Sequence, residues 1–206
     1  KSNITIKNIL LKNFETTIFA NNVDTLTVEN IFAAGGYQTQ KFEINNSQHV
    51  ILHDFYPNSA KLYINNSDDV EISGADDNIS GNYRSGWDNV AIENSHNIEI
   101  KNSYISGGSY PHGTITITSV SSNINIHDNT FSYLYSQTAP YDQRGHGSNI
   151  KIINNDIRNQ IQITGAFASG PFIISENNFQ TFSGWRLVIS DYGSSGYLDD
   201  YGIGYH

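Results

Sequence analysis

The phrase Asn-Ile-Asn-Ile-His-Asp at residues 123–128 decides the fold, because variants of it recur along the whole 206-residue chain. It alternates apolar and polar residues, which is the period of a β-strand with one buried face. The first apolar residue marks each copy: Ile4, Leu26, Val50, Val70, Ile98, Ile124, Ile150 and Phe172. Successive copies lie 20 to 28 residues apart, on average 24. The sequence is therefore a repeat array with a short unit.

Each unit has room for two further short strands. A second alternating triplet usually precedes the phrase, as at residues 42–44 and 62–64, and a large apolar residue such as Phe55 or Phe131 follows it. Three short strands in about 24 residues are typical of one coil of a parallel β-helix. We predict an all-β fold, a single-stranded right-handed parallel β-helix of about eight coils over residues 1–190, followed by a cap or non-helical tail at 191–206.

One polar position closes every phrase. It is occupied by Asn8, Asn30, Asp54, Gly74, Asn102, Asp128, Asn154 and Glu176. Six of these eight residues are Asn or Asp, which adopt left-handed backbone angles more readily than most side chains. Such residues suit a turn between the second and third strands, and their stacked amides can hydrogen-bond from coil to coil. We therefore predict an Asn ladder along one corner of the helix.

Charge and composition narrow the class of partner. The net charge of −9 argues against nucleic acid and against anionic membrane surfaces. No apolar run approaches the roughly 18 residues that span a bilayer. The chain has no cysteine, which excludes disulfides and thiolate metal sites and fits an extracellular or virion-associated location. It begins inside the repeat pattern without a secretory leader, so we expect a mature product or a segment of a longer protein.

The stacked coils and the Asn ladder, from Asn3 to about Ile189, resemble the pectin-lyase-like β-helix superfamily. That group includes pectate lyases, polygalacturonases, polysaccharide epimerases and the tailspike depolymerases of bacteriophages. The resemblance implies the fold and a polysaccharide partner. The activity itself has to be argued from the site.

The longest coils indicate a working face. Three consecutive intervals, from Val70 to Ile150, carry extra residues at 76–88, 106–113 and 132–147. We expect all three insertions to follow a third strand and to crowd one side of the rod, where function concentrates. Aromatic faces beside charged groups suit a sugar chain. The expected sugar-binding residues are Tyr83, Arg84, Trp87, Tyr110 and Tyr141, with Lys61; alternatively, these are ordinary surface side chains.

Candidate catalytic residues lie in the same insertions. Asp88 and Asp142 are the leading pair of carboxylates for a glycoside hydrolase, which needs two acids that flank the scissile bond. His112 and His146, with Arg144, would serve β-elimination, in which a base removes a proton and a cation stabilises the developing charge. The alternative is that each Asp caps a turn or pairs with an arginine, and that each His is a surface residue.

The triplet Gly145-His146-Gly147 resembles a motif of polygalacturonases, which would imply that His146 is an active-site residue. Other motifs of that family are missing. Its Asn-Thr-Asp has no counterpart at residues 85–88, which read Ser-Gly-Trp-Asp, and no Arg-Ile-Lys follows. The chain is therefore not an ordinary polygalacturonase.

These residues predict a tailspike-like enzyme, a glycoside hydrolase or polysaccharide lyase acting on a bacterial surface or other extracellular glycan. The alternative is a non-catalytic adhesin, glycan-binding rod or structural tail appendage. No cofactor is expected, although Asp68-Asp69 and Asp76-Asp77 are candidate Ca²⁺ ligands. A flat outward column suits a polymer bed or a subunit contact in a homotrimer: Phe19, Glu43, Tyr63, Ala91, Thr116 and Gln162, with Lys41 and Lys61 beside it.

Overall fold

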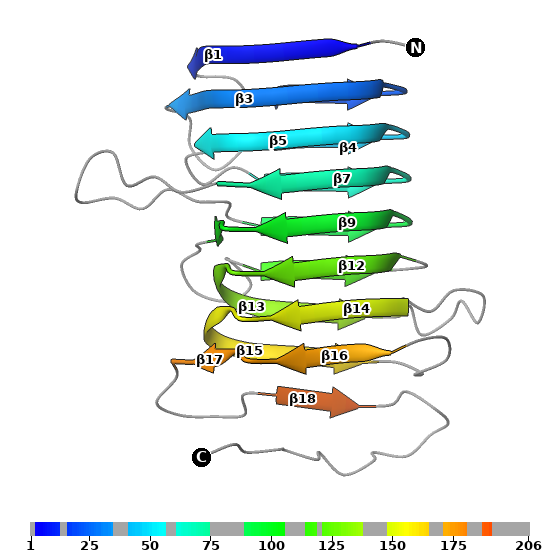
Figure 1. Cartoon of the computed structure of the whole chain (residues 1–206), viewed down its shortest axis with the longest axis vertical. Helices are drawn as coiled ribbons and strands as arrows, with labels where there is room; N and C mark the ends of the chain where they lie inside the picture. The colour runs from blue at the N-terminus through cyan, green and yellow to red at the C-terminus, as the bar shows by residue number, and fades with distance from the viewer. Residues whose placement is uncertain are drawn as a thin grey trace.

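The computed structural model describes residues 3–12, 16–34, 41–56, 61–74, 89–105, 114–118, 121–137, 148–164, 171–180 and 187–190. Within these ranges all regular structure is β, and every strand pairing is parallel. The predicted parallel β-helix is thereby confirmed (Figure 1). The same residues contain no helix long and apolar enough to cross a membrane.

The first sheet holds the eight phrases side by side. Its strands are, in spatial order, β1 (Ile4–Lys12), β3 (Asp24–Ala34), β5 (Gln48–Tyr56), β7 (Asp68–Ser73), β9 (His96–Lys101), β12 (Ser122–His127), β14 (Ser148–Ile153) and β16 (Phe172–Ser175). The register places the first apolar residue of each phrase beside that of the next, as in Ile4 with Leu26 and Ile124 with Ile150. The repeat period read from the sequence is therefore the register of the sheet.

The second sheet contains the strands that precede the phrases, together with two short strands, β10 and β17, that follow a phrase. Its members are β2 (Thr16–Asn21), β4 (Lys41–Asn45), β6 (Lys61–Asn65), β8 (Asn89–Glu93), β10 (Tyr104–Ile105), β11 (Thr114–Thr118), β13 (Thr130–Gln137), β15 (Asp156–Thr164), β17 (Asn178–Phe179) and β18 (Leu187–Ser190). The arrows of the two sheets point in opposite directions in Figure 1, since the chain crosses from one to the other in every coil.

Separate third strands form only in part. In the early coils the chain stays in one strand through the corner: the β1–β3 register skips Asn8 and resumes at Ile9. In later coils the third strand merges with the next strand of the second sheet, because β13 begins at Thr130 and runs to Gln137. Pairing thus continues across corners that the sequence marks as breaks.

The interpretation of residues 132–147 as one insertion is wrong. Residues 133–137 belong to β13 and pair with Thr114–Thr118 of β11. The residues outside the described part of this coil are 138–147, and they join the end of β13 to the start of β14. In the coil of β6 and β7 the same corner needs only Asn66 and Ser67.

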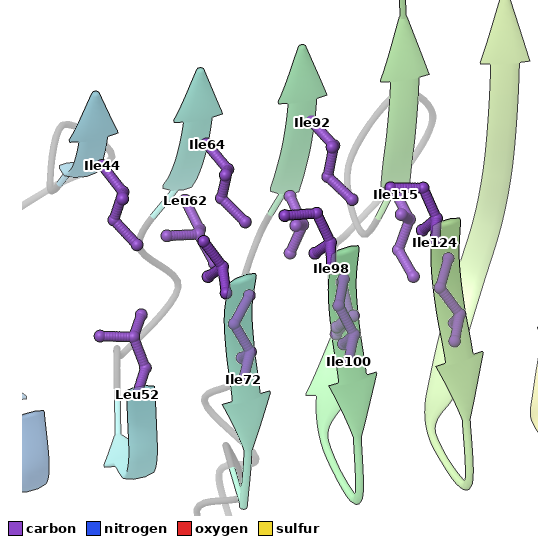
Figure 2. Close-up of a cluster of buried hydrophobic side chains, with 14 of the residues drawn as sticks. Ile44, Leu52, Leu62, Ile64, Ile72, Ile92, Ile98, Ile100, Ile115 and Ile124 are labelled. Carbon is purple, nitrogen blue, oxygen red and sulfur yellow. The ribbon is translucent and has the colours of Figure 1, made fainter. Parts of the chain in front are cut away.

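Aliphatic side chains fill the space between the two sheets. Strand β4 alternates between exposed and buried positions, with Phe42 and Ile44 inward. Figure 2 shows such side chains from both sheets pointing toward one another, among them Ile64, Ile72, Ile92 and Ile100. Each buried residue of this size contributes about 1.5–3 kcal/mol, and neighbouring coils supply the rest of its surroundings.

The predicted Asn ladder forms at an exposed corner. All eight of its residues have left-handed backbone angles, from φ 48° at Asp54 and Asn102 to 67° at Gly74. The Asn30 Nδ2 donates to the Asn8 Oδ1 at 2.6 Å, and the Asn154 Nδ2 donates to the Asp128 Oδ1 at 2.5 Å. The left-handed column is thus confirmed, and side-chain bonds join two of its steps.

Two buried ladders accompany the exposed one. Ser47, Ser67, Ser95 and Ser121 stack inside the opposite corner, and the backbone N–H of each of the first three donates to the next Oγ at 3.1–3.2 Å. Beside the exposed ladder, the Asn129 and Asn155 backbone N–H groups donate to the Oδ1 of Asn155 and Asn177. These ladders satisfy backbone groups that the corners would otherwise bury unpaired.

Candidate functional site

Most of the predicted site residues lie outside the described part of the chain. These are the proposed catalytic residues Asp88, His112, Asp142, Arg144 and His146 and the proposed sugar contacts Tyr83, Arg84, Trp87, Tyr110 and Tyr141. The Asp76-Asp77 pair and the predicted cap at 191–206 also fall there. Their convergence on one cleft stays a prediction. Of the predicted site, Lys61 is described.

The strands that flank these segments are described, and they correct one expectation. Residues 75–88 connect the first sheet at Gly74 to the second sheet at Asn89. Residues 138–147 instead connect the second sheet at Gln137 to the first sheet at Ser148. Since the two sheets run in opposite directions, these segments are attached at opposite ends of the strands. The expectation that all three insertions leave from one corner is wrong.

The outer face of the second sheet carries the predicted flat column. Strand register places Phe19, Glu43, Tyr63, Ala91 and Thr116 beside one another in successive coils. The next position belongs to Tyr135, which the sequence analysis left in an insertion, and Gln162 follows it. The column is therefore confirmed through Thr116 and has one additional member before Gln162.

Two lysines stand next to each other at the edge of this column. Lys41 pairs in register with Lys61, and the Lys41 Nζ lies 6.0 Å from the centre of the Tyr63 ring. Among the described residues no carboxylate forms an ion pair with either lysine. Like charges opposite one another on adjacent strands are destabilising. A ligand that brings oxygen atoms or negative charge to this point would offset that repulsion.

Exposed apolar surface borders the lysines. The Phe19 side chain is 59% exposed on β2, one strand from Glu43 and two from Tyr63. Solvent-exposed aromatic rings offer flat faces that stack on the apolar faces of sugars. Polar side chains beside the rings can reach the sugar hydroxyl groups. We call the surface formed by Phe19, Lys41, Glu43, Lys61 and Tyr63 the lysine–aromatic face.

The first sheet carries a network of charged groups that the sequence pattern did not predict. The Lys101 Nζ contacts the carboxylates of Glu71 at 3.1 Å and Glu99 at 2.6 Å. The His127 Nε2 lies 3.1 Å from Glu99, and its Nδ1 lies 2.6 Å from Asp128. The network of contacts thus crosses β7, β9 and β12.

These contacts shift the protonation of the groups concerned. Hydrogen bonding to Lys101 lowers the pKa of Glu99, and bonding to His127 lowers the pKa of Asp128. Partial burial lowers the pKa of His127, but its bonds to Asp128 and Glu99 outweigh this and raise the pKa above its usual value. The shifts in pKa of Glu99, Lys101, His127 and Asp128 therefore all favour the charged form of each group.

We call the network formed by Glu71, Glu99, Lys101, His127 and Asp128 the brace, because it links adjacent coils. It is unsuited to proton transfer. Both nitrogens of His127 are engaged, and Glu99 contacts both Lys101 and His127. General acid–base catalysis instead needs a group that exchanges a proton with the substrate. The repeat places Glu71 beside Glu99 and Lys101 beside His127, but it does not indicate that the two columns bond to each other.

An open hollow of about 320 Å³ adjoins the brace at the corner. Its lining includes the carboxylates of Asp128, Asp156 and Glu176 and the amides of Asn154 and Asn178. Within the described ranges, no three His, Asp or Glu side chains are grouped so as to hold a metal ion. Asp69, one of the calcium candidates, accepts a hydrogen bond from the Asn97 Nδ2 at 2.9 Å.

Comparison with family models, with curated proteins and with solved structures finds no match to this chain.

Proposed function

We propose that this protein is an extracellular polysaccharide-binding β-helix and that the lysine–aromatic face is its polymer bed. The observation that carries the proposal is the Lys41–Lys61 pair, which has no carboxylate partner among the described residues and stands beside Tyr63. In a chain with 20 acidic and 11 basic residues, two adjacent lysines without an ion pair to any described carboxylate favour a ligand rich in oxygen.

The geometry of the face suits an extended polymer. Parallel strands repeat about every 4.8 Å, and an extended polysaccharide advances by a comparable length for each sugar residue. One coil can therefore meet one sugar. Phe19 and Tyr63 would support ring faces, while Lys41 and Lys61 would bind hydroxyl or carboxylate oxygens.

Cleavage of the bound polymer is the second part of the proposal. It rests on the sequence: Asp88 and Asp142 as acid and base, His146 and His112 as proton carriers, and Arg144 as anion clamp. Kinship with pectin-lyase-like enzymes, and with tailspike depolymerases in particular, is proposed on the same ground. Binding needs only the lysine–aromatic face, so a non-catalytic rod is the alternative if the acids do not meet.

Binding is tested with a panel of acidic and neutral bacterial capsular and O-antigen polysaccharides, measured by calorimetry. Lys61→Ala and Tyr63→Ala should each weaken the affinity for a bound polymer by about tenfold, which corresponds to ~1.4 kcal/mol. Lys151→Ala makes the same change of charge on the outer face of the first sheet and should leave the affinity unaltered. Equal losses in Lys61→Ala and Lys151→Ala would contradict the assignment of the bed.

A further inference from the structure

The lysine–aromatic face lies between two rows of side chains with different chemistry. In β4 and β6 outward and buried residues alternate, so the first, third and fifth residues of each strand share this face. The first residues are Lys41 and Lys61, and the fifth are Asn45 and Asn65. Register then places Glu93 of β8 beside Asn65. We call the row of Lys41 and Lys61 the lysine edge and the row of Asn45, Asn65 and Glu93 the amide edge.

The lysine edge is suited to one acidic group. Lys41 and Lys61 are register partners on neighbouring strands, which lie about 4.8 Å apart, so both ammonium groups can reach the same anion. No described carboxylate forms an ion pair with either of them. An anionic group between the two lysines would form charge-assisted hydrogen bonds and offset the repulsion of the two cations.

The amide edge is suited to a neutral group. Glu93 is exposed there and forms no ion pair with a described cation, so its carboxylate repels a second acid. The Asn65 Oδ1 is the one buried side-chain nitrogen or oxygen without a hydrogen-bond partner in the described ranges. Rotation about the broad terminal torsion of Asn65 can turn this atom toward a ligand. Both groups only accept hydrogen bonds, which favours hydroxyl or acetamido N–H groups at this edge.

An extended polysaccharide presents its substituents to the two edges in turn. Where equatorial bonds link the sugars, successive rings face alternate ways, so the same substituent points to opposite sides on odd and even sugars. With one coil for each sugar, a polymer along the bed directs one such substituent to the lysine edge and the next to the amide edge. An acid on every sugar would therefore set half of the acids against Glu93, and Glu43 in the middle column adds to the repulsion.

We propose that the lysine–aromatic face selects polysaccharides in which an acidic sugar alternates with a neutral one. The acid lies at the lysine edge and the neutral substituent at the amide edge. This selectivity rests on the proposed function, because it assigns a substrate class to the same bed. Tyr63 supports the ring faces between the two edges, with the Lys41 Nζ 6.0 Å from its ring centre. Specificity comes from attraction at Lys41 and Lys61 combined with repulsion at Glu93.

Calorimetry of the full chain with three oligosaccharides of equal length, at one ionic strength, tests the proposal. Hyaluronan alternates glucuronate with N-acetylglucosamine, mannuronan carries an acid on every sugar, and chitin oligosaccharides carry none. Hyaluronan should bind at least about tenfold more tightly than either of the others. Lys61→Ala should remove its advantage over the chitin oligosaccharide, because the attractive contact is lost.

Glu93→Gln removes the repulsive group of the amide edge. It should raise the affinity for mannuronan by about threefold, as expected for one exposed charge contact, and leave the affinity for hyaluronan unchanged. Glu176→Gln makes the same change of charge at the exposed corner after β16 and should alter neither affinity. Circular dichroism of each variant shows whether the fold is kept.

Two results would overturn the selectivity, and they bear differently on the proposed function. If mannuronan or the chitin oligosaccharide binds as tightly as hyaluronan and Lys61→Ala weakens that binding, the bed stands and the selectivity is wrong. If none of the three probes binds in a manner that depends on Lys61, the selectivity is also wrong. The bed itself fails only if the capsular and O-antigen panel shows no binding that depends on Lys61 either.

Discussion

Asn129 shows how a buried amide holds a corner of this helix. Its Nδ2 donates to the Ile100 carbonyl at 2.8 Å, and its Oδ1 accepts from the Ser103 backbone N–H at 2.9 Å. Asn129→Ala removes both bonds from a buried corner, so we predict a loss of about 1–3 kcal/mol in the free energy of unfolding. Urea denaturation measures it. Asn125→Ala, on the outer face, should stay within about 0.5 kcal/mol; equal losses would contradict the prediction.

His127 should give the stability a dependence on pH. Its pKa is raised in the folded protein, so its contribution is complete below the ordinary histidine pKa and is lost as pH rises through the folded value. The pKa values of Glu99 and Asp128 are lowered, so their contributions are present above ordinary carboxylate values and are lost as pH falls. The brace is therefore strongest between about pH 5 and 6.5.

Thermal denaturation from pH 5 to pH 8 tests this expectation. His127→Gln should lower the melting temperature at pH 5.5 and should flatten the decline toward pH 8. His96→Gln is the matched control, because the His96 Nδ1 contacts the Ser122 hydroxyl and no described carboxylate. If the melting temperature falls equally toward pH 8 in wild type and in His127→Gln, His127 is not the cause of the fall.

Among the strands, β7 ends at Ser73, directly before the one glycine of the predicted Asn ladder. Gly74 has φ +67°, and a Cβ there would lie 2.6 Å from the Asp54 Oδ1. Gly74→Ala should therefore destabilise the protein by about 1–2 kcal/mol. Gly74→Asn should cost less, because Asn tolerates this angle and its amide can donate to Asp54 as Asn30 donates to Asn8. Chemical denaturation of both variants decides the order.

The strands that sequence reasoning found are those whose pattern repeats. The phrases of the first sheet were predictable because two inward apolar residues recur in each, as in Ile124 and Ile126. Residues 133–137 escaped because they read Tyr-Leu-Tyr-Ser-Gln, in which Leu134 is the one aliphatic residue. They become a strand because β11 and β15 on either side supply the pairing, and tertiary context overrides a weak local preference.

Over the whole molecule, the repeat predicts which residues share a column but not how their side chains pair. The column from Phe19 to Thr116 follows from the period alone. The brace around His127 does not, because Glu99 lies 28 residues away and looks in isolation like an ordinary solvated strand residue. The exposed Asn ladder was predictable from its backbone preference, whereas the serine ladder required knowing that residues 47, 67, 95 and 121 face inward.

The proposed cleavage belongs to the whole molecule, since it needs segments from several coils. Asp142→Asn and His146→Ala should each lower the turnover of a polymer that the lysine–aromatic face binds by at least about a hundredfold, with the affinity unchanged. Lys61→Ala should instead weaken binding and spare turnover at saturation. Product release is followed by reducing ends and by the absorbance of unsaturated sugars. Unchanged turnover in both Asp142→Asn and His146→Ala would contradict the proposed catalytic residues and would favour the non-catalytic binding rod.

The corner between β13 and β14 shows that connection length and strand register are uncoupled in this fold. Ten residues join these strands where two suffice between β6 and β7, yet Ser148 still pairs with Ser122 and Ile150 with Ile124. Foreign segments can therefore be exchanged at such corners while the stack beneath them stays the same. The scaffold is suited to rapid diversification of whatever its corners present, and to engineering by grafting.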